Sequence, residues 1–295
     1  MATKTRCGFV AIVGRANVGK STLFNALLGE QLSIATHKPQ TTRHNIRGIL
    51  SLETRQLVLV DTPGIQLGNK RLINKVLISN ALSSLQEVDV ILMVAEMGRW
   101  SDEDDYLLNQ VKEANRPTVL VINKIDRMKD KSALLPILED AKGRYEFEDI
   151  IPISALHDKS MNTLTNVLCS QVPESVFLFP KDVTWDRDDA FVISEIVRGT
   201  AITQLHKELP YAIYTEVENL TFDENLISIG VVIWVEKDSQ KGIVIGKKGS
   251  KLKTIGEQAR NRLERVFNKK VMLKTWVKVK QNWQDQQDIV SQFKE

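Results

Sequence analysis

The sequence predicts an α/β domain, with a mostly parallel sheet and helices on both faces, followed by a smaller α+β domain. In the first half of the 295 residues, short apolar runs alternate with amphipathic stretches, which is typical of strand–helix–strand units. After Leu168 the predicted order becomes helix, two strands, helix and strand. We therefore divide the chain into a first domain at 1–172, a linker at 173–189 that contains two prolines, and a second domain at 190–295.

Five apolar runs in the first domain have the length of buried strands. They are Phe9–Val13, Leu57–Val60, Val90–Ala95, Thr118–Ile122 and Ile150–Ile153. Between the third and the fourth run, Asp102–Ala114 carries its apolar residues at helical spacing. Strands and helices in this alternation favour parallel pairing.

The second domain is expected to begin with a helix at about Ala190–Leu205. The elements expected after it are strands at Ala212–Val217 and Leu226–Val235, an apolar turn at Ile243–Ile245, an amphipathic helix at Ser250–Phe267 and a strand at Val271–Val279. The last strand alternates apolar residues with lysines, so one of its faces should be basic.

Composition favours a soluble globular protein, because 42% of the residues are hydrophobic and 26% are charged. We expect no membrane-spanning segment and no signal peptide, and hence a cytoplasmic protein with Cys7 and Cys169 as reduced structural thiols. The net charge is only +3, but Lys237–Lys280 contains fourteen basic and three acidic residues. This asymmetry suggests that one end of the chain meets a polyanion; a solvated helix face is the alternative.

A glycine-rich stretch follows the first predicted strand and opens a helix. It reads Gly14-Arg15-Ala16-Asn17-Val18-Gly19-Lys20-Ser21, continued by Thr22, and fits G-x-x-x-x-G-K-[ST]. Such a loop turns backbone N–H groups and a helix N-terminus toward phosphate. Lys20 can reach the β- and γ-phosphates, and the Ser21 hydroxyl can bind Mg²⁺. The stretch therefore predicts a phosphate-binding loop.

A second signal ends the next predicted strand. Asp61, at the carboxyl end of that strand, suits a water-mediated contact with Mg²⁺, and the Gly64 N–H suits the γ-phosphate. Thr62 and Pro63 complete this segment, and Ile65 follows it.

A threonine between these two signals could complete the Mg²⁺ site when a γ-phosphate is present. The segment Pro39–Arg43 offers two candidates, of which we prefer Thr42 and keep Thr41 as the alternative. The alternative is that this threonine only begins a strand.

The base-recognition signal follows the strand at Thr118–Ile122. Asp126 can accept hydrogen bonds from the N1–H and the amine of guanine, a donor pair that adenine lacks. The Lys124 stem can lie over the base, and Asn123 can brace the loops. Ser154 and Ala155 end the next strand, and the Ala155 N–H could donate to guanine O6.

Together these signals resemble the five signatures of the translation-factor class of P-loop GTPases, over Phe9 to about Leu168. GTP, GDP and Mg²⁺ are therefore the expected ligands. Ile65 stands where some GTPases carry a water-orienting glutamine, so slow intrinsic turnover is expected. Catalysis would then rest on Lys20, Thr42 and Gly64. Asn17 resembles the asparagine of GTPases that recruit K⁺, and we expect it to hold such an ion together with the loop around Thr36–Thr41; a simple turn former is the alternative.

A G-x-x-G loop lies in the basic end of the chain. Gly246-Lys247-Lys248-Gly249 precedes the amphipathic helix, in the element order of a KH domain. Its glycines would let the nucleic-acid backbone approach, and its lysines would meet phosphate. Further phosphate contacts are expected from three basic residues of the helix, Lys251, Lys253 and Arg260.

A P-loop GTPase domain followed by a KH domain resembles the Era family of bacterial GTPases. Short segments of the sequence also resemble this family, for example Gln40-Thr41-Thr42-Arg43-His44 and Trp276-Val277-Lys278-Val279-Lys280. The resemblance covers essentially the whole chain. It implies maturation of the 30S ribosomal subunit, binding of single-stranded RNA near the 3′ end of 16S ribosomal RNA, and peripheral contact with the inner membrane. We expect the protein to be a monomer.

Two other functions are compatible with the same residues. The chain could be an RNA-binding assembly scaffold in which GTP is a structural ligand, because Ile65 supplies no catalytic group. It could also be a GTPase whose second domain is a membrane-surface module. An intact set of phosphate and Mg²⁺ residues favours turnover over the scaffold.

Overall fold

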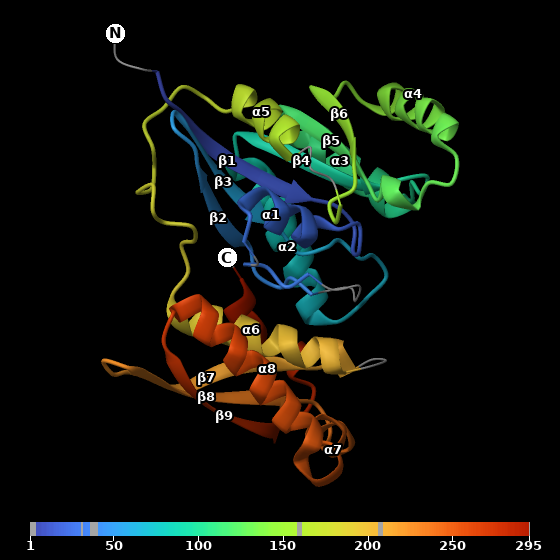
Figure 1. Cartoon of the computed structure of the whole chain (residues 1–295). Helices are drawn as coiled ribbons and strands as arrows, with labels where there is room; N and C mark the ends of the chain where they lie inside the picture. Colours follow the sequence, from blue (N-terminus) through green and yellow to red (C-terminus); the bar gives the residue numbers. More distant parts are fainter. Residues whose placement is uncertain (1–3, 31, 36–40, 158–160, 206–208, 295) are drawn as a thin grey trace. The chain divides into compact units, whose positions relative to one another are not determined.

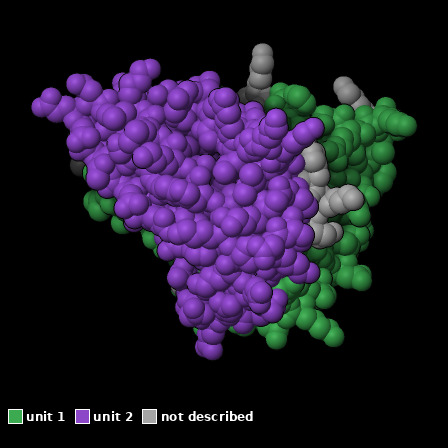
Figure 2. All heavy atoms as spheres, turned by 90° about the horizontal axis from the view of Figure 1, so that it is seen from below, with its two compact units in different colours: residues 1–186, 293–295 green, residues 187–292 purple. Residues whose placement is uncertain are grey.

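The fold is that of a computed structural model, which describes residues 4–30, 32–35, 41–157, 161–205 and 209–294. The chain divides into two compact units, coloured separately in Figure 2. Unit 1 comprises Met1–Asp186 and Phe293–Glu295, and unit 2 comprises Arg187–Gln292.

Unit 1 contains a six-stranded sheet in the order β2-β3-β1-β4-β5-β6 (Figure 1). Its strands are β1 (Arg6–Val13), β2 (Ile46–Ser51), β3 (Arg55–Asp61), β4 (Val90–Glu96), β5 (Thr118–Asn123) and β6 (Asp149–Ile153). All neighbours pair in parallel except β2 with β3. The predicted parallel sheet is therefore confirmed, and the carboxyl ends of β1, β3, β4 and β5 meet at one edge.

Helices cover both faces of this sheet (Figure 1). They are α1 (Lys20–Leu28), α2 (Leu72–Glu87), α3 (Asp102–Ala114), α4 (Leu134–Arg144) and α5 (Met161–Gln171). α2, α3 and α4 share one apolar core with the strands, whereas α1 and α5 contact each other and β1 and β3. In the part of the chain that the structure describes, no helix has both the length and the apolar character needed to cross a bilayer.

The antiparallel edge strand β2 was not expected from the sequence. It contains Gly48, a residue type that is unfavourable in strands. Close packing against α1 explains why a glycine stands at this position. A Cβ atom at this position would lie 2.3 Å from Leu28 Cδ1 and 2.7 Å from Phe24 Cζ. The outer edge of β2 is covered by the segment before Asp186, because the Ile49 N–H donates to the Thr184 carbonyl at 2.8 Å.

A fully buried glutamine anchors the same segment. Gln56 Oε1 accepts the N–H groups of Leu178 and Phe179 at 2.9 and 3.0 Å, and Nε2 donates to the Phe179 carbonyl and to Ser51 Oγ. These bonds hold residues that we expected in a linker against the sheet of unit 1. The linker at 173–189 and the boundaries on either side of it stay predictions.

Unit 2 contains a three-stranded sheet in the order β7-β8-β9, with β8 parallel to β9. Its elements are α6 (Asp189–Gln204), β7 (Tyr214–Phe222), β8 (Leu226–Val235), α7 (Asp238–Ile245), α8 (Ser250–Phe267), β9 (Lys270–Val279) and α9 (Gln287–Val290). α6 and α8 pack their apolar faces against the strands in one core. The predicted α+β domain is confirmed.

Three elements of unit 2 differ from the expectation: β7 continues to Phe222, α9 was not expected, and α7 replaces a turn. Ile243–Ile245, expected as an apolar turn, is the last turn of α7, which begins at Asp238. Gln240 stabilises its start, because Oε1 accepts the N–H groups of Glu236 and Lys237 at 2.8 and 3.1 Å. The helix is short and only Val244 is buried, so it has no apolar periodicity that could reveal it.

The two cysteines lie in unit 1 and form no disulfide. Cys7 and Cys169 are both buried free thiols. Burial raises the pKa of each thiol, which keeps it protonated and unreactive. A structural role of the two side chains agrees with this placement.

Replacing the buried glutamine should destabilise unit 1. Gln56→Leu removes the acceptor of the Leu178 and Phe179 N–H groups and the donor to the Phe179 carbonyl, so we expect a loss of about 1–3 kcal/mol in the free energy of unfolding. Gln86→Leu, at an exposed position of α2, should change it by less than about 0.5 kcal/mol. Urea unfolding followed by circular dichroism measures both; equal losses would contradict the assignment.

Candidate nucleotide site and nucleic-acid interface

The glycine-rich loop joins β1 to α1 at the carboxyl edge of the parallel sheet. Asn17 and Gly19 have positive φ angles of 66° and 103°, and a Cβ atom on Gly19 would lie 2.3 Å from Asn123 Nδ2. The loop borders a pocket lined by Ala16, Asn17, Gly19, Lys20, Ser21, Thr22, Ile34, Ala35, Thr41, Thr42 and Gly64. Most residues predicted for phosphate and Mg²⁺ therefore surround one hollow at the start of α1.

Lys20 is buried beneath this loop. Its Nζ donates to the carbonyl oxygens of Gly14 and Arg15, at 3.0 Å each. Burial lowers the pKa of Lys20 from 10.5 to about 8, and the negative charge of Asp61 opposes that effect only in part. A phosphate group in the pocket would supply the missing negative charge.

Three oxygen atoms gather beside Lys20 in a way that suits a hard cation. Ser21 Oγ and Thr42 Oγ1 share a hydrogen bond of 2.8 Å, and Thr42 Oγ1 lies 3.2 Å from Asp61 Oδ2. Asp61 is completely buried, and burial raises the pKa of its carboxyl group. Within the described residues, no hydrogen-bond donor reaches Asp61 Oδ1. Oxygen ligands with an unsatisfied carboxylate fit Mg²⁺.

Of the two candidate threonines, Thr42 is the one that contacts both Ser21 and Asp61. Thr41 lines the pocket farther along the same loop. Sequence reasoning missed Ser33, whose Oγ donates to Asp61 Oδ2 at 2.7 Å. The loop Thr36–Thr41, which we expected beside a K⁺ ion, lies outside the described residues except for Thr41.

The segment after Asp61 is fastened to the phosphate loop. The Ile65 N–H donates to the Gly14 carbonyl at 3.2 Å, and its carbonyl accepts the Ala16 N–H at 3.0 Å. A Cβ atom on Gly64 would lie 2.8 Å from Ala16 Cα, so only glycine fits this close approach. The Ile65 side chain is buried in the core of unit 1, where it cannot orient water.

The predicted base-recognition residues gather at the ends of β5 and β6. Asn123 Nδ2 donates to the Val18 carbonyl at 2.8 Å, and Oδ1 accepts the Ala155 N–H at 3.0 Å. Asn123 therefore braces the phosphate loop, as expected, but it also engages the N–H group that we assigned to guanine O6. Ser154 Oγ donates to the exposed carboxylate of Asp126 at 2.5 Å.

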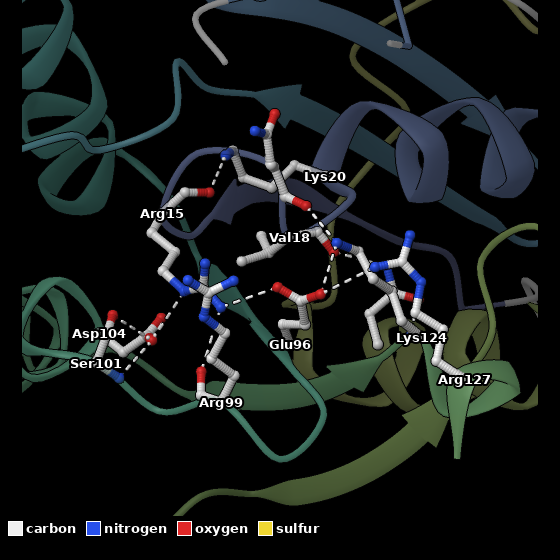
Figure 3. A network of polar contacts seen from close by, with 11 residues as sticks. Arg15, Val18, Lys20, Glu96, Arg99, Ser101, Asp104, Lys124 and Arg127 are labelled. Carbon is white, nitrogen blue, oxygen red and sulfur yellow. Dashed lines mark hydrogen bonds and ion pairs between the residues drawn. The ribbon is translucent and has the colours of Figure 1, made fainter. Parts of the chain in front are cut away.

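Two side chains of the nucleotide loops form ion pairs that the sequence did not predict (Figure 3). Arg15 has its guanidinium group bonded to Glu96 and Asp104, at 3.0 Å each, and it does not line the pocket. Lys124 donates to the Asn17 carbonyl at 2.6 Å and to Glu96 at 3.0 Å. Glu96 ends an apolar run at the same sheet edge as Asp61, which is the signal that could have identified it.

The G-x-x-G loop of unit 2 lies between α7 and α8. Gly246, Lys248 and Gly249 have φ angles of 74°, 51° and 77°, and Lys247 and Lys248 are exposed. A Cβ atom on Gly246 would lie 2.7 Å from Lys251 Cβ, so this glycine is required for close packing. The positive φ angles turn the loop sharply and present its two lysines to solvent.

A groove runs from this loop along α8 and β9. It is lined by Gly249, Leu252, Lys253, Gly256, Glu257, Arg260, Leu273 and Thr275. Of the helix residues predicted to contact RNA, Lys253 and Arg260 border the groove, whereas the Lys251 stem packs against Gly246. The lining combines apolar side chains, which suit bases, with two basic residues, which suit phosphates, although Glu257 also lines the groove and lies 3.9 Å from Lys253.

Comparison with known proteins gives matches along nearly the whole chain. A family model described as 50S ribosome-binding GTPase matches residues 9–124, and one described as KH domain matches residues 208–284. The proteins named GTPase Era from Stenotrophomonas maltophilia (strain R551-3) and Xylella fastidiosa (strain M12) are each 46% identical to the chain. The alignments cover 99% and 98% of the chain and 98% and 97% of the relatives.

Two solved structures are similar over the same extent. One is Era in complex with MgGDPNP and nucleotides 1506–1542 of 16S ribosomal RNA, with a TM-score of 0.94, 35% identity and 98% of both chains covered. The other is an Aquifex aeolicus Era variant bound to GDP·AlF4⁻, with a TM-score of 0.94, 35% identity and coverage of 98% of this chain and 99% of that one.

The lowered pKa of Lys20 predicts how nucleotide binding depends on pH. The free protein loses the Lys20 proton above about pH 8, whereas bound phosphates retain it, so binding takes up a proton in that range. The Kd for GDP should rise about fourfold from pH 7 to pH 8.5, with uptake of roughly 0.8 proton at pH 8.5. Calorimetric titrations in buffers of different ionisation enthalpy measure both; no uptake at pH 8.5 would contradict the prediction.

Proposed function

The chain belongs to the Era family of GTPases, and we propose that it hydrolyses GTP as a switch that binds small-subunit ribosomal RNA during maturation of the 30S subunit. One observation carries this proposal: the same chain has a complete set of nucleotide-site residues and a G-x-x-G groove with a basic rim. The matched Era structure holds both a GTP analogue and a 16S RNA segment, which supports the pairing of these two ligands. The family model whose description names the 50S subunit matches only residues 9–124, and therefore not the part of the chain to which we assign RNA binding.

Within the nucleotide site, we assign binding of the phosphates to the backbone N–H groups of Gly14–Ser21 and to Lys20. Mg²⁺ would be held by Ser21, by Thr42 and, through water, by Asp61, and it would neutralise charge on the β- and γ-phosphates. Lys20 would keep its proton beside those phosphates. The Gly64 N–H would contact the γ-phosphate from the segment that Ile65 fastens to the loop.

Guanine selection would rest on Asp126, whose carboxylate is exposed at the end of the sheet and oriented by Ser154. Adenine would leave that carboxylate without its donor pair, which disfavours ATP. For the Ala155 N–H to reach guanine O6, it would have to leave Asn123 Oδ1. Asn123 can accept other donors, since it also receives the Lys124 N–H at 2.8 Å.

RNA binding is assigned to Gly246–Gly249 and to the groove residues Lys253 and Arg260. The two loop lysines are exposed, and their loop, which reads Gly-Lys-Lys-Gly, contains no acidic residue. Charge of this kind gives affinity that falls with salt, whereas the groove walls contact bases. The chemistry therefore fits a single-stranded RNA better than a membrane surface.

The location and the assembly state rest on the family alone. We propose a cytoplasmic monomer, with peripheral contact with the inner membrane as a secondary property. Binding to anionic vesicles that survives Gly249→Asp, with no RNA binding, would support the membrane alternative over the RNA proposal. Unchanged RNA affinity and subunit maturation in a Lys20→Ala variant that binds no nucleotide would favour the scaffold alternative.

RNA binding should depend on the loop lysines through salt. With a single-stranded RNA of the 16S 3′ end, the Lys247→Ala, Lys248→Ala double variant should bind more weakly and reduce the slope of log K against log salt by about 1.4. Fluorescence anisotropy at several KCl concentrations measures the slope. Lys142→Ala, at an exposed lysine of unit 1, is the matched control, and equal slopes in all proteins would refute the assignment.

We also propose that Asn17, which lines the pocket, holds a K⁺ ion beside the phosphates. A cation there would stabilise charge that develops in the transition state. GTP hydrolysis in KCl should then exceed that in NaCl by more than about fivefold. Asn17→Gly, which tolerates the positive φ angle of this residue, should abolish the difference. Equal rates of the unaltered protein in both salts would show that Asn17 is a turn former.

A further inference from the structure

A cluster of ion pairs joins the nucleotide loops to the end of β4 (Figure 3). β4 pairs with β1 on one side and with β5 on the other, and each of these neighbours leads directly into a nucleotide loop. Glu96 is the last residue of β4 and is in register with Asn123. The topology therefore puts its carboxylate between the phosphate loop and the base-recognition loop.

Each oxygen of this carboxylate serves a different loop. Glu96 Oε2 accepts a hydrogen bond from Arg15 Nη2 at 3.0 Å, whereas Oε1 accepts from Lys124 Nζ at 3.0 Å and from Arg127 at 3.3 Å. The side chain of Glu96 is only 13% exposed. Burial raises the pKa of Glu96, but the bonds from Lys124 and Arg15 outweigh this and hold the pKa below its usual value.

The two loops depend on Glu96 to different degrees. Arg15 Nε also donates to Asp104 at 3.0 Å, and Nη2 to the Arg99 carbonyl at 3.2 Å. Asp104 is itself fixed by the N-terminal cap of α3, where it accepts from the backbone and the side chain of Ser101. Without Glu96, Arg15 would therefore keep a carboxylate.

Lys124 has no such second carboxylate among the contacts of the described residues. The remaining hydrogen bond of its side chain goes to the Asn17 carbonyl, in the phosphate loop. Lys124 also has a positive φ angle of 69°, so its backbone turns sharply just before Asp126. The Glu96 carboxylate is thus the group that holds the Lys124 side chain, and with it this turn, against the phosphate loop.

We propose that Glu96 is a positioning residue for nucleotide binding, which acts through Lys124 to hold the base-recognition loop in place. The inference rests on the proposed GTP binding and adds a residue to it. Glu96 does not line the phosphate pocket, so it affects affinity and leaves the chemical step alone. Its effect is therefore the same for GDP and GTP.

The first test uses Glu96→Gln, which keeps the shape of the side chain and removes its charge. The Kd for fluorescent GDP rises about tenfold, while single-turnover hydrolysis at saturating GTP changes by less than about twofold, because only uniform binding is lost. Glu87→Gln, the same change at an exposed position of α2, leaves both values unaltered. A substitution that only destabilised the fold would not raise the Kd and leave the hydrolysis rate unchanged.

The second test asks whether Glu96 acts through Lys124. Coupled residues give non-additive effects, so in a Lys124→Ala background the change Glu96→Gln raises the Kd by less than about threefold. If Glu96→Gln raised the Kd tenfold in both backgrounds, Glu96 would not act through Lys124. If Glu96→Gln does not fold, as judged by circular dichroism, Glu96→Ala replaces it; this change removes the carboxylate from both loops, and the same outcomes apply.

These outcomes separate this inference from the proposed function. If the unaltered protein and Glu87→Gln bind no GDP, the proposed function fails. If both bind GDP and Glu96→Gln binds it equally well, the proposed function stands and the role of Glu96 is refuted. A fall in the hydrolysis rate of Glu96→Gln at saturating GTP as large as its loss of affinity also refutes a positioning role, because the residue would then act on the chemical step.

Discussion

Two opposite charges buried side by side constrain the whole nucleotide site. Lys20 and Asp61 are almost completely buried. Burial lowers the pKa of Lys20 and raises the pKa of Asp61, so it favours the neutral form of each. Their mutual attraction offsets only part of the cost of burying the two charges. The arrangement suits a site that ligands complete, since a phosphate would supply negative charge to Lys20 and Mg²⁺ would supply positive charge to Asp61. Parallel pairing of β1 and β3 brings the two residues to the same edge.

A second set of charged residues, outside the pocket, connects the nucleotide loops to one another. Arg15 turns its side chain away from the pocket toward Glu96 and Asp104, and Lys124 joins the phosphate loop to the end of β4. These ion pairs connect the loops to which we assign nucleotide binding. The site therefore depends on residues from four strands, and the order of those strands decides which side chains can meet.

Local motifs predicted much of this, and long-range packing accounts for most of what they missed. The loop Gly14–Ser21 could be read from the sequence because its chemistry needs fixed spacing within eight residues. Glu96 and Gln56 could not, because their partners lie in other elements and no short pattern marks them. α7 escaped notice because its single buried residue, Val244, gives no helical period. Even within the motif, the backbone role of Arg15 was foreseen and the direction of its side chain was not.

The central claim is that one chain couples GTP hydrolysis to RNA binding. It is tested most directly by single-turnover GTP hydrolysis in KCl, with and without a saturating single-stranded RNA from the 16S 3′ end. We expect the RNA to change the rate by at least about fivefold in the unaltered protein. Gly249→Asp, which places a negative side chain at a φ angle of 77° in the loop, should abolish the response. Tight RNA binding with an unchanged rate of hydrolysis would contradict the claim.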